Sequence, residues 1–347
     1  MNVQASIFSK MPEPGGPLCA SAYLLDAPAV TTDPETKFRK LSDVLARGVN
    51  LPWICYGGDF GANAWAPAGG LSCRDSSDLH RILERAATAG TQLIRWFVLT
   101  DGRAGISYDA SGTPRELQPV VLDDLAVALD ALRTHGLRMV PVLFDFTWTD
   151  AARVVNDVRL GGRAAVLRDA VSRHALWRVV DTLVGPFGRH EGIAMWDLWN
   201  EPDWMMAPWR PPVRRLAPRR VRQALEELAL HVRWHATQPI TVGLASTRGL
   251  SLCRMLDLDV LQVHWYDPLE SRAPLAHRPD VPWSRAPWIL GEFPTRGSAR
   301  TPETIVSMAR HAGYVAAWPW SLNADDRSTD SEATVEVLAA CGDEPDT

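Results

Sequence analysis

The chain has 347 residues, of which 46% are hydrophobic and 22% are charged. This composition allows a sizeable buried core and argues against global disorder. The formal net charge of −5 argues against a nucleic-acid-binding protein, which usually has a basic face. No segment approaches the roughly 20 consecutive apolar residues that a transmembrane helix needs, so we expect no membrane partner.

The five cysteines are scattered along the chain and form no CxxC pair. This pattern argues against a zinc site and against a full disulfide framework. Isolated thiols are typical of a reducing compartment, and no charged segment followed by an apolar one marks a signal peptide near the N-terminus. We therefore expect a cytoplasmic protein, with secretion as the alternative if a signal segment is missing from this sequence.

Short apolar segments alternate with helical ones along the chain, which is the pattern of βαβ units and a parallel sheet. Strands of such a sheet are covered on both faces and read as continuous apolar runs. Residues 1–45 are predicted to be an extension that packs on a domain of residues 46–342, and residues 343–347 form a tail. Eight segments are predicted as strands: 48–53, 92–99, 137–144, 193–199, 240–245, 260–265, 288–291 and 314–318.

Helices are predicted between most of these strands, from apolar residues spaced three and four positions apart. One helix follows Ser77 and ends at Gly90, and the next ends at Gly136. The helix after Thr301 has an N-cap residue there and Pro302 at its first position. Three further helices are predicted over residues 164–184, 221–232 and 331–340.

Two of the connections differ from the rest. Residues 246–258 have room for only a short helix, and residues 268–286 are proline-rich without a helical period. Eight strands with helices between most of them nevertheless favour a single-domain (β/α)8 barrel, the TIM barrel. A doubly wound open sheet is the structural alternative, but its GxGxxG fingerprint is missing after the first strand.

The active site of a (β/α)8 barrel lies at the C-terminal ends of its strands. In chain order, the predicted strand ends carry Arg95, Asp145, Asn200, Glu201, His264, Tyr266, Glu292 and Trp320. Two of these residues are glutamates that follow strongly apolar runs. Either one alone would equally be a cap or a solvated charge. Glycoside hydrolysis needs such a pair, one carboxylic acid to protonate the leaving oxygen and one carboxylate to attack the anomeric carbon.

Five short motifs occur in order between residues 48 and 323. They are Ile94-Arg95, WDLWNEP from Trp196, HWY from His264, WILGEF from Trp288 and WPWSL from Trp318. Together they resemble the clan A glycoside hydrolases, and most closely family 5, the cellulase and mannanase family. The resemblance implies double displacement with retention, with Glu201 as acid/base and Glu292 as nucleophile, and it implies no metal or other cofactor.

The resemblance also implies roles for the neighbours of these glutamates. Asn200 would bind the 2-hydroxyl of the reacting sugar, with a capping role as its alternative. Arg95 and Tyr266 would keep Glu292 ionised, and the alternative for Arg95 is a purely structural ion pair. Trp320 would lie under the sugar ring, with simple core packing as its alternative.

Four further residues complete the predicted lining of the site. His264 shares a strand face with Tyr266, because residues two apart point to the same side, and core packing is the alternative for both. Asp145 lies where many family 5 members have histidine and asparagine, so this residue leaves the substrate class open. Asp59 and Trp65 follow the first strand, where they would contact a terminal sugar or form a turn.

The chain after the acid/base is also predicted to shape the cleft. Trp204 would line it directly. Residues 205–220 are rich in proline and arginine, and long loops of this kind are often functional. They would form a cleft wall that favours an acidic glycan, or else a solvated loop with arginine–carboxylate pairs.

Several functions stay open at this point. The first is a retaining β-glycoside hydrolase with a carbohydrate substrate, endo- or exo-acting, or a transglycosylase that uses the same residues. The second is a catalytically silent carbohydrate-binding barrel, against which the presence of both glutamates argues. The third is a metal-dependent hydrolase, but the nine histidines form no HxH or HxxxH cluster at a strand end. The sugar, the linkage and the oligomeric state are not determined by the sequence.

Overall fold

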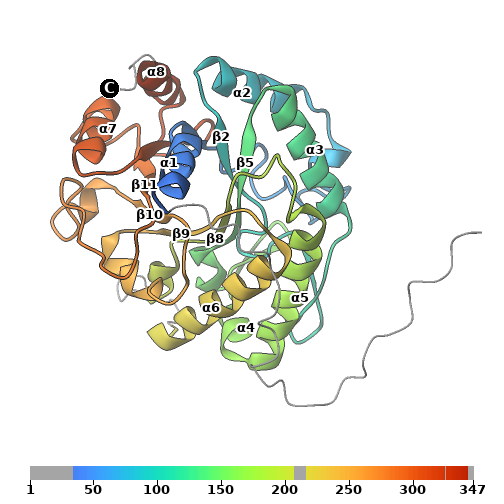
Figure 1. The fold of residues 1–347 in the computed structure, drawn as a ribbon. Helices are drawn as coiled ribbons and strands as arrows, with labels where there is room; N and C mark the ends of the chain where they lie inside the picture. The colour runs from blue at the N-terminus through green and yellow to red at the C-terminus, as the bar shows by residue number, and fades with distance from the viewer. Residues whose placement is uncertain (1–33, 207–215, 325, 343–347) are drawn as a thin grey trace, which may run out of the picture. The chain divides into compact units, whose positions relative to one another are not determined.

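The computed structural model describes residues 34–206, 216–324 and 326–342. Residues 38–347 form one compact unit, and residues 1–37 group separately. Within the described residues, eight parallel strands follow one another around a ring (Figure 1), which confirms the predicted (β/α)8 barrel. Their bounds are β1 Gly48–Asn50, β2 Leu93–Phe97, β5 Arg138–Asp145, β8 Trp196–Asn200, β9 Ile240–Leu244, β10 Leu261–His264, β11 Trp288–Pro294 and β12 Ala316–Trp320.

The ring closes between the first and last strands through Asn50. Its backbone oxygen accepts a hydrogen bond from Leu322 N at 2.9 Å. Its side-chain amide donates to the carbonyl oxygens of Gly291 and Pro319 at 2.9 Å and 3.1 Å. A single buried asparagine therefore joins β1 to both β11 and β12.

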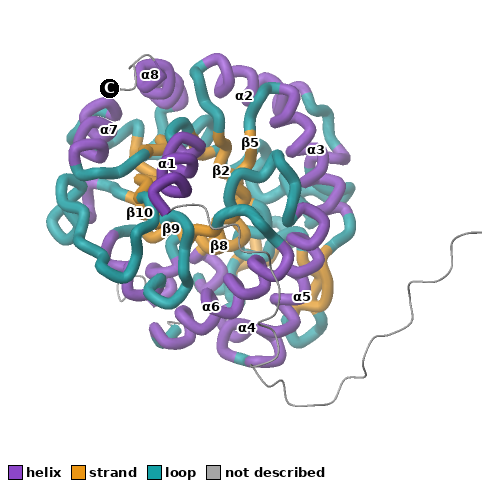
Figure 2. Tube along the Cα trace, viewed as in Figure 1, coloured by secondary structure: helices purple, strands orange, loops and turns teal. Residues whose placement is uncertain are grey.

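Helices cover the outside of the strands (Figure 2). The helix predicted over residues 164–184 is in fact two helices, because Asp169 has an extended backbone and its carboxylate caps the second one by accepting from Ser172 N. The connections after β9 and β10 contain only 3-10 turns, at Thr247–Leu252 and Asp267–Leu269. The first agrees with the short helix expected within residues 246–258, and the second with the missing helical period of residues 268–286. The helices are α1 Pro34–Leu45, α2 Ser77–Thr88, α3 Val120–Thr134, α4 Ala164–Arg168, α5 Ala170–Phe187, α6 Pro218–His235, α7 Pro302–His311 and α8 Ser331–Gly342.

Two short hairpins follow β2 and β5, and the sequence patterns did not predict either. The first pairs β3 (Ile106–Tyr108) with β4 (Pro114–Leu117), and the second pairs β6 (Arg153–Val155) with β7 (Val158–Leu160). The second turns at Asn156 and Asp157, which both have positive φ. That pair of residue types suits a two-residue hairpin turn. Both hairpins leave from strand ends and so rise on the side of the predicted active site.

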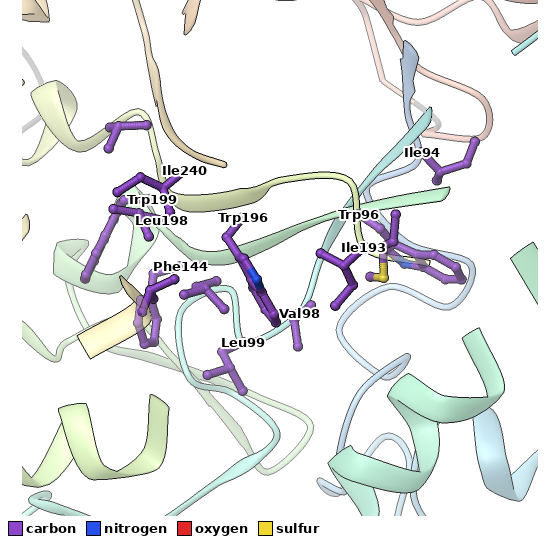
Figure 3. Close-up of a cluster of buried hydrophobic side chains, with 14 of the residues drawn as sticks. Ile94, Trp96, Val98, Leu99, Phe144, Ile193, Trp196, Leu198, Trp199 and Ile240 are labelled. Atoms are coloured by element: carbon purple, nitrogen blue, oxygen red, sulfur yellow. The ribbon is translucent and has the colours of Figure 1, made fainter. Parts of the chain in front are cut away.

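Most of the core lies between the strands and the surrounding helices. Figure 3 shows Trp96, Trp196 and Trp199 in this layer, with Phe144 and several branched aliphatic side chains. The fully buried tryptophans belong to this packing rather than to a ligand surface. Among the described residues, no helix is long and apolar enough to span a membrane, and Cys55, Cys73 and Cys253 are free thiols.

The N-terminal end of the barrel is closed by an apolar cluster. Leu41 and Leu45 of α1 pack there against residues near the strand starts, including Leu93 and Val260. Trp318 Nε1 also donates a 3.0 Å hydrogen bond to Leu45 O. Because this end is sealed, the polar interior of the barrel opens only at the C-terminal ends of the strands. The predicted packing of residues 1–33 and the tail of residues 343–347 lie outside the described residues.

Candidate active site

Arg95 stands at the centre of the barrel interior and holds four residues from three other strands of the ring. Its Nε donates to Asp197 Oδ2 at 2.9 Å, and its Nη2 donates to Asn200 Oδ1 at 2.8 Å. Its Nη1 donates to Glu292 Oε1 at 2.5 Å and to Asn50 Oδ1 at 3.0 Å. The guanidinium is fully buried between two carboxylates. Such charge-assisted bonds fix both the charge and the geometry of the site.

Glu292 lies on β11 with a donor at each carboxylate oxygen. Arg95 contacts Oε1, and the hydroxyl of Tyr266 donates to Oε2 at 3.2 Å. Burial raises the pKa of Glu292, and the charge of Glu201 adds to this effect, while the positive charge and the hydrogen bond of Arg95 act to lower it. The two donors therefore oppose the effect of burial and favour the carboxylate form.

Glu201 directly follows β8, at a sharp change in chain direction. Its φ of 48° lies in the left-handed region, which is uncommon for a residue other than glycine and is often found at functional sites. The 3-10 helix Pro202–Met206 begins immediately after it. Glu201 Oε1 lies 3.0 Å from His264 Nδ1, and the side chain keeps some exposure to solvent.

The two glutamates face each other across His264. One side-chain ligand atom from each of Glu201, His264 and Glu292 lies within 4.8 Å of the other two. The trio therefore also has the spacing of a cation site. Arg95, however, already supplies a positive charge 2.5 Å from Glu292. A second cation at the same carboxylate would be repelled by that guanidinium.

His264 is neutral in this environment. Burial lowers its pKa to about 4, an effect only partly opposed by Glu292, and Arg95 lowers it further. Its Nδ1 lies 3.0 Å from Glu201 Oε1 and 3.4 Å from Glu292 Oε2. The imidazole thus contacts both carboxyl groups without adding a full charge to the site.

Asn200 is oriented from both ends of its amide. Its oxygen accepts from Arg95, and its Nδ2 donates to Asp145 Oδ2 at 2.8 Å. Asp145 also accepts hydrogen bonds from the backbone and the hydroxyl of Thr147, and burial raises its pKa. Asp145 therefore holds Asn200 in place, and its predicted contact with a sugar stays a prediction. An amide nitrogen has two hydrogens, so a second N–H of Asn200 is available for a ligand.

Trp320, at the end of β12, contacts two aromatic residues that line a cavity. Its ring makes edge contacts with Trp53 at 6.4 Å and Phe97 at 6.2 Å. Its Nε1 donates to Asp326 Oδ2 at 2.9 Å. Trp53 and Phe97, together with Tyr56 and Arg103, line a cavity of about 190 Å³. The rings of Trp53 and Phe97 therefore connect Trp320 to this cavity.

Asp59 lines this cavity, and Trp65 contacts Tyr56, another residue of its lining. The Asp59 carboxylate accepts hydrogen bonds from the backbone of Ile54 and Cys55 and from Trp96 Nε1, at 2.6, 2.7 and 2.9 Å. Burial raises the pKa of Asp59 to about 6.

Trp65 stacks on Tyr56 with ring centroids 5.9 Å apart and donates from Nε1 to Val155 O at 3.0 Å. Asp59 thus holds the loop that carries Trp53 and Tyr56, and Trp65 ties the β6–β7 hairpin to it. Direct contact of Asp59 or Trp65 with a sugar stays a prediction.

Trp204 lies in the 3-10 helix after Glu201 and is half-buried, with its backbone N–H bonded to Glu201 O at 3.0 Å. Its position beside Glu201 is compatible with the predicted lining role. Of the predicted wall at residues 205–220, residues 207–215 lie outside the described residues. The preference for an acidic glycan that this segment suggested is therefore still a prediction.

Several residues of the site were not predicted from the sequence. Asn50 is the last residue of β1, whereas Asp197 and Gln262 lie inside β8 and β10, and all three are buried. A carboxylate in the apolar run WDLW was a usable signal, because a buried charge must have a partner. The aromatic residues Trp53 and Tyr56 lie in a glycine-containing loop that reads as a simple turn.

Comparison with known proteins adds to this geometry. No family model matches the chain. A segment of 167 residues is 25% identical to a mannan endo-1,4-beta-mannosidase of Cryptopygus antarcticus, over 48% of this chain and 40% of that protein. The chain thus spans well under two thirds of that curated relative.

Solved structures match over much more of the chain. An endo-1,4-beta-mannanase from Eisenia fetida has a TM-score of 0.72 and 18% identity, and the match covers 87% of this chain and 92% of that one. A beta-1,4-D-mannanase from Cryptopygus antarcticus has a TM-score of 0.69 and 16% identity, covering 87% and 91%. This chain has the same fold as these mannanases. The fold implied by the sequence resemblance to clan A is thereby confirmed.

Proposed function

We propose that this chain is a retaining β-glycosidase that hydrolyses β-1,4-linked mannose chains. The observation that carries the proposal is the opposition of Glu201 and Glu292, with side-chain oxygens within 4.8 Å of each other. Retaining enzymes hold their two carboxyl groups about 5–5.5 Å apart, whereas inverting enzymes leave about 6.5–9.5 Å for a water molecule. The short separation in this site favours attack by a carboxylate.

In the first step, Glu292 attacks the anomeric carbon while Glu201 gives its proton to the leaving oxygen. The bond to the leaving sugar breaks as the ester bond to Glu292 forms. Arg95 and Tyr266 hold one oxygen each of the attacking carboxylate. In this proposal the second N–H of Asn200 binds the 2-hydroxyl, a contact that strengthens in the transition state.

In the second step, a water molecule replaces the departed sugar. The charge of Glu292 has disappeared into the ester, so Glu201 carries the only free carboxylate of the pair and can accept a proton from water. The resulting hydroxyl attacks the anomeric carbon and releases Glu292. The sugar leaves with its original β configuration, since each step inverts the carbon once.

The choice of mannose is supported by the mannan-degrading relatives of matching fold. Transglycosylation and silent carbohydrate binding are the competing functions, and the experiment below separates them. The cytoplasmic location expected from the sequence stays a prediction.

The test is a hydrolysis screen of the wild type beside Glu292→Ala. Mannohexaose is compared with the corresponding glucose and xylose oligosaccharides, and the anomer released first is identified by NMR. We expect mannohexaose hydrolysis with the β anomer first, its loss in Glu292→Ala, and partial recovery when azide replaces the missing nucleophile. Longer products at high substrate concentration would favour a transglycosylase. Silence from folded wild type that still binds mannohexaose would overturn the proposal in favour of a binding protein.

A further inference from the structure

A chain of hydrogen bonds runs through the barrel interior behind the two glutamates. Gln262 Nε2 donates to Asp197 Oδ2 at 2.9 Å and lies 3.3 Å from His264 Nε2. Asp197 is itself held by Arg95 Nε at 2.9 Å and by Gly243 N at 3.2 Å. The mechanism described above uses neither Gln262 nor Asp197, although both are fully buried.

Asp197 determines which groups in this chain of hydrogen bonds donate and which accept. A carboxylate that is ion-paired to Arg95 can only accept hydrogen bonds, so the Gln262 amide must present its nitrogen to it. The second hydrogen on that nitrogen then points to His264 Nε2. Neutral imidazole has one donor and one acceptor nitrogen. His264 therefore accepts at Nε2 and carries its proton on Nδ1, which faces Glu201 Oε1 at 3.0 Å.

Glycines on the two strands that flank β10 leave room for the Gln262 side chain. A Cβ atom at Gly243 of β9 would lie 2.6 Å from Gln262 Nε2, and one at Gly291 of β11 would lie 2.6 Å from Gln262 Cγ. Contacts that short do not occur, so both strands must have glycine there for Gln262 to fit.

The oxygen of the Gln262 amide has no hydrogen-bond partner within the described part of the chain. A leucine at position 262 would fill the same space and would bury no unpaired oxygen. Packing alone therefore does not explain the presence of a glutamine here. The contacts of Nε2 supply one.

We propose that Gln262 is a positioning residue that fixes the tautomer of His264 and thereby the location of the proton on Glu201. With the His264 proton on Nδ1, Glu201 Oε1 is an acceptor, and the acid proton resides on Oε2, where it can reach the leaving oxygen. The opposite tautomer would let Glu201 donate into His264 Nδ1 and hold the proton away from the substrate. The role in catalysis rests on the proposed function, whereas the tautomer itself does not.

The tautomer is measured on the resting protein by NMR with ¹⁵N-labelled histidine. The resonances of His264 are assigned by their loss in His264→Asn. We expect Nδ1 to be protonated and Nε2 to be unprotonated at neutral pH in the wild type. A protonated Nε2 would overturn the proposal whether or not the protein hydrolyses any glycoside.

The catalytic part is tested with Gln262→Glu, which places an acceptor at His264 Nε2. We expect the His264 proton to move to Nε2, and kcat/KM for mannooligosaccharides to fall at least tenfold. An activated aryl β-mannoside, which needs little acid assistance, should lose less than threefold. Equal losses on both substrates would overturn the role in acid catalysis.

Two further variants separate positioning from folding. Gln262→Leu removes the donor without adding a charge beside Asp197. Gln262→Leu should also lower kcat/KM more for mannooligosaccharides than for the aryl β-mannoside, but by a smaller factor than Gln262→Glu. If the ratio of these two kcat/KM values were unchanged in Gln262→Leu, the proposal would be contradicted even if Gln262→Glu does not fold. Gln238→Leu is the matched control. Gln238 precedes β9 at the other end of the barrel and bonds to Phe187 O and His190 O. Gln238→Leu should leave the ratio of the kcat/KM values for the two substrates unchanged.

Discussion

The hydroxyl of Tyr266 lies 3.2 Å from Oε2 of Glu292 and donates a hydrogen bond to it. Burial holds the pKa of Tyr266 well above its usual value of 10, so the hydroxyl keeps its proton at neutral pH. This donor completes the set around Glu292, because Arg95 reaches only the other oxygen. The Glu292 carboxylate is thus oriented by Arg95 of β2 and by Tyr266, which follows β10.

Tyr266→Phe should slow the reaction without unfolding the protein. A hydrogen bond to a charged group contributes about 1.5–3 kcal/mol, which corresponds to a fall in kcat of roughly ten- to hundredfold on mannooligosaccharides. Steady-state kinetics measure this fall. Tyr314→Phe is the control, since Tyr314 is buried against Trp288 at the far end of β12 and its loss should leave kcat unchanged. A wild-type kcat in Tyr266→Phe would contradict the proposed orientation of Glu292.

Glu201→Ala should slow substrates according to their leaving groups. Without an acid, the step that breaks the glycosidic bond depends on how readily the leaving oxygen departs unprotonated. We expect kcat/KM to fall by about a hundredfold or more for mannooligosaccharides and far less for a dinitrophenyl β-mannoside. Glu303→Ala, which removes an exposed glutamate of α7, serves as the control and should change neither value. Equal losses on both substrates would remove Glu201 from the acid role.

The cavity beside Trp320 predicts a dependence on chain length. Tyr56 is 48% exposed although it lines this cavity, so its ring is available to cover a sugar face. Tyr56→Ala would remove on the order of 1–2 kcal/mol of apolar contact and lower kcat/KM for mannohexaose roughly five- to thirtyfold.

Mannobiose fills fewer positions and should be affected much less. Trp283→Ala, at an exposed tryptophan outside this lining, should affect neither substrate. A chain-length-independent effect of Tyr56→Ala would show that the cavity does not bind sugar.

Asp59 should make the free energy of unfolding depend on pH. Its pKa rises from 3.8 to about 6 in the folded protein because burial outweighs its three hydrogen bonds. The folded state therefore binds a proton more tightly than the unfolded state. The resulting stabilisation is complete below pH 3.8 and is lost as the pH rises through 6.

Relative to Asp59→Asn, which cannot ionise, the wild type should lose about 2.4 kcal/mol of unfolding free energy between pH 4 and pH 7. Denaturant titrations of both proteins at unit pH intervals measure this difference in unfolding free energy. The effects of other titratable groups cancel, because both proteins contain them. Parallel pH dependences of the two proteins would show that Asp59 is not perturbed.

The sequence predicted the barrel and the residues at its open end for one physical reason. Continuous apolar runs identify strands that are covered on both faces. The polar residue that follows each run then lies at the C-terminal end of the barrel. Glu201, His264 and Glu292 were found in this way, and the structure brings them together. Their roles depend on experiments.

The polar residues inside the barrel were not predicted. Asp197 and Gln262 point inward from the middle of strands, and which residues they meet depends on the register of strands far apart in sequence. Local periodicity contains no information about that register. The break at Asp169 was missed because helical spacing of apolar residues continues across it, and the β6–β7 hairpin was missed because its strands are only three residues long.

The centre of the barrel also constrains how this chain can fold. Arg95 and Glu292 are 197 residues apart in sequence, and closing so long a loop has an entropic cost that neighbouring contacts must offset first. A fragment that ends after β8 would contain Arg95 and Asp197 but lack Glu292, Gln262 and the strands that exclude water from them. In such a fragment the polar groups of the barrel interior would lack the ion-pair and hydrogen-bond partners that the missing strands supply. We therefore expect such fragments to stay unfolded and the complete ring to form in one cooperative transition.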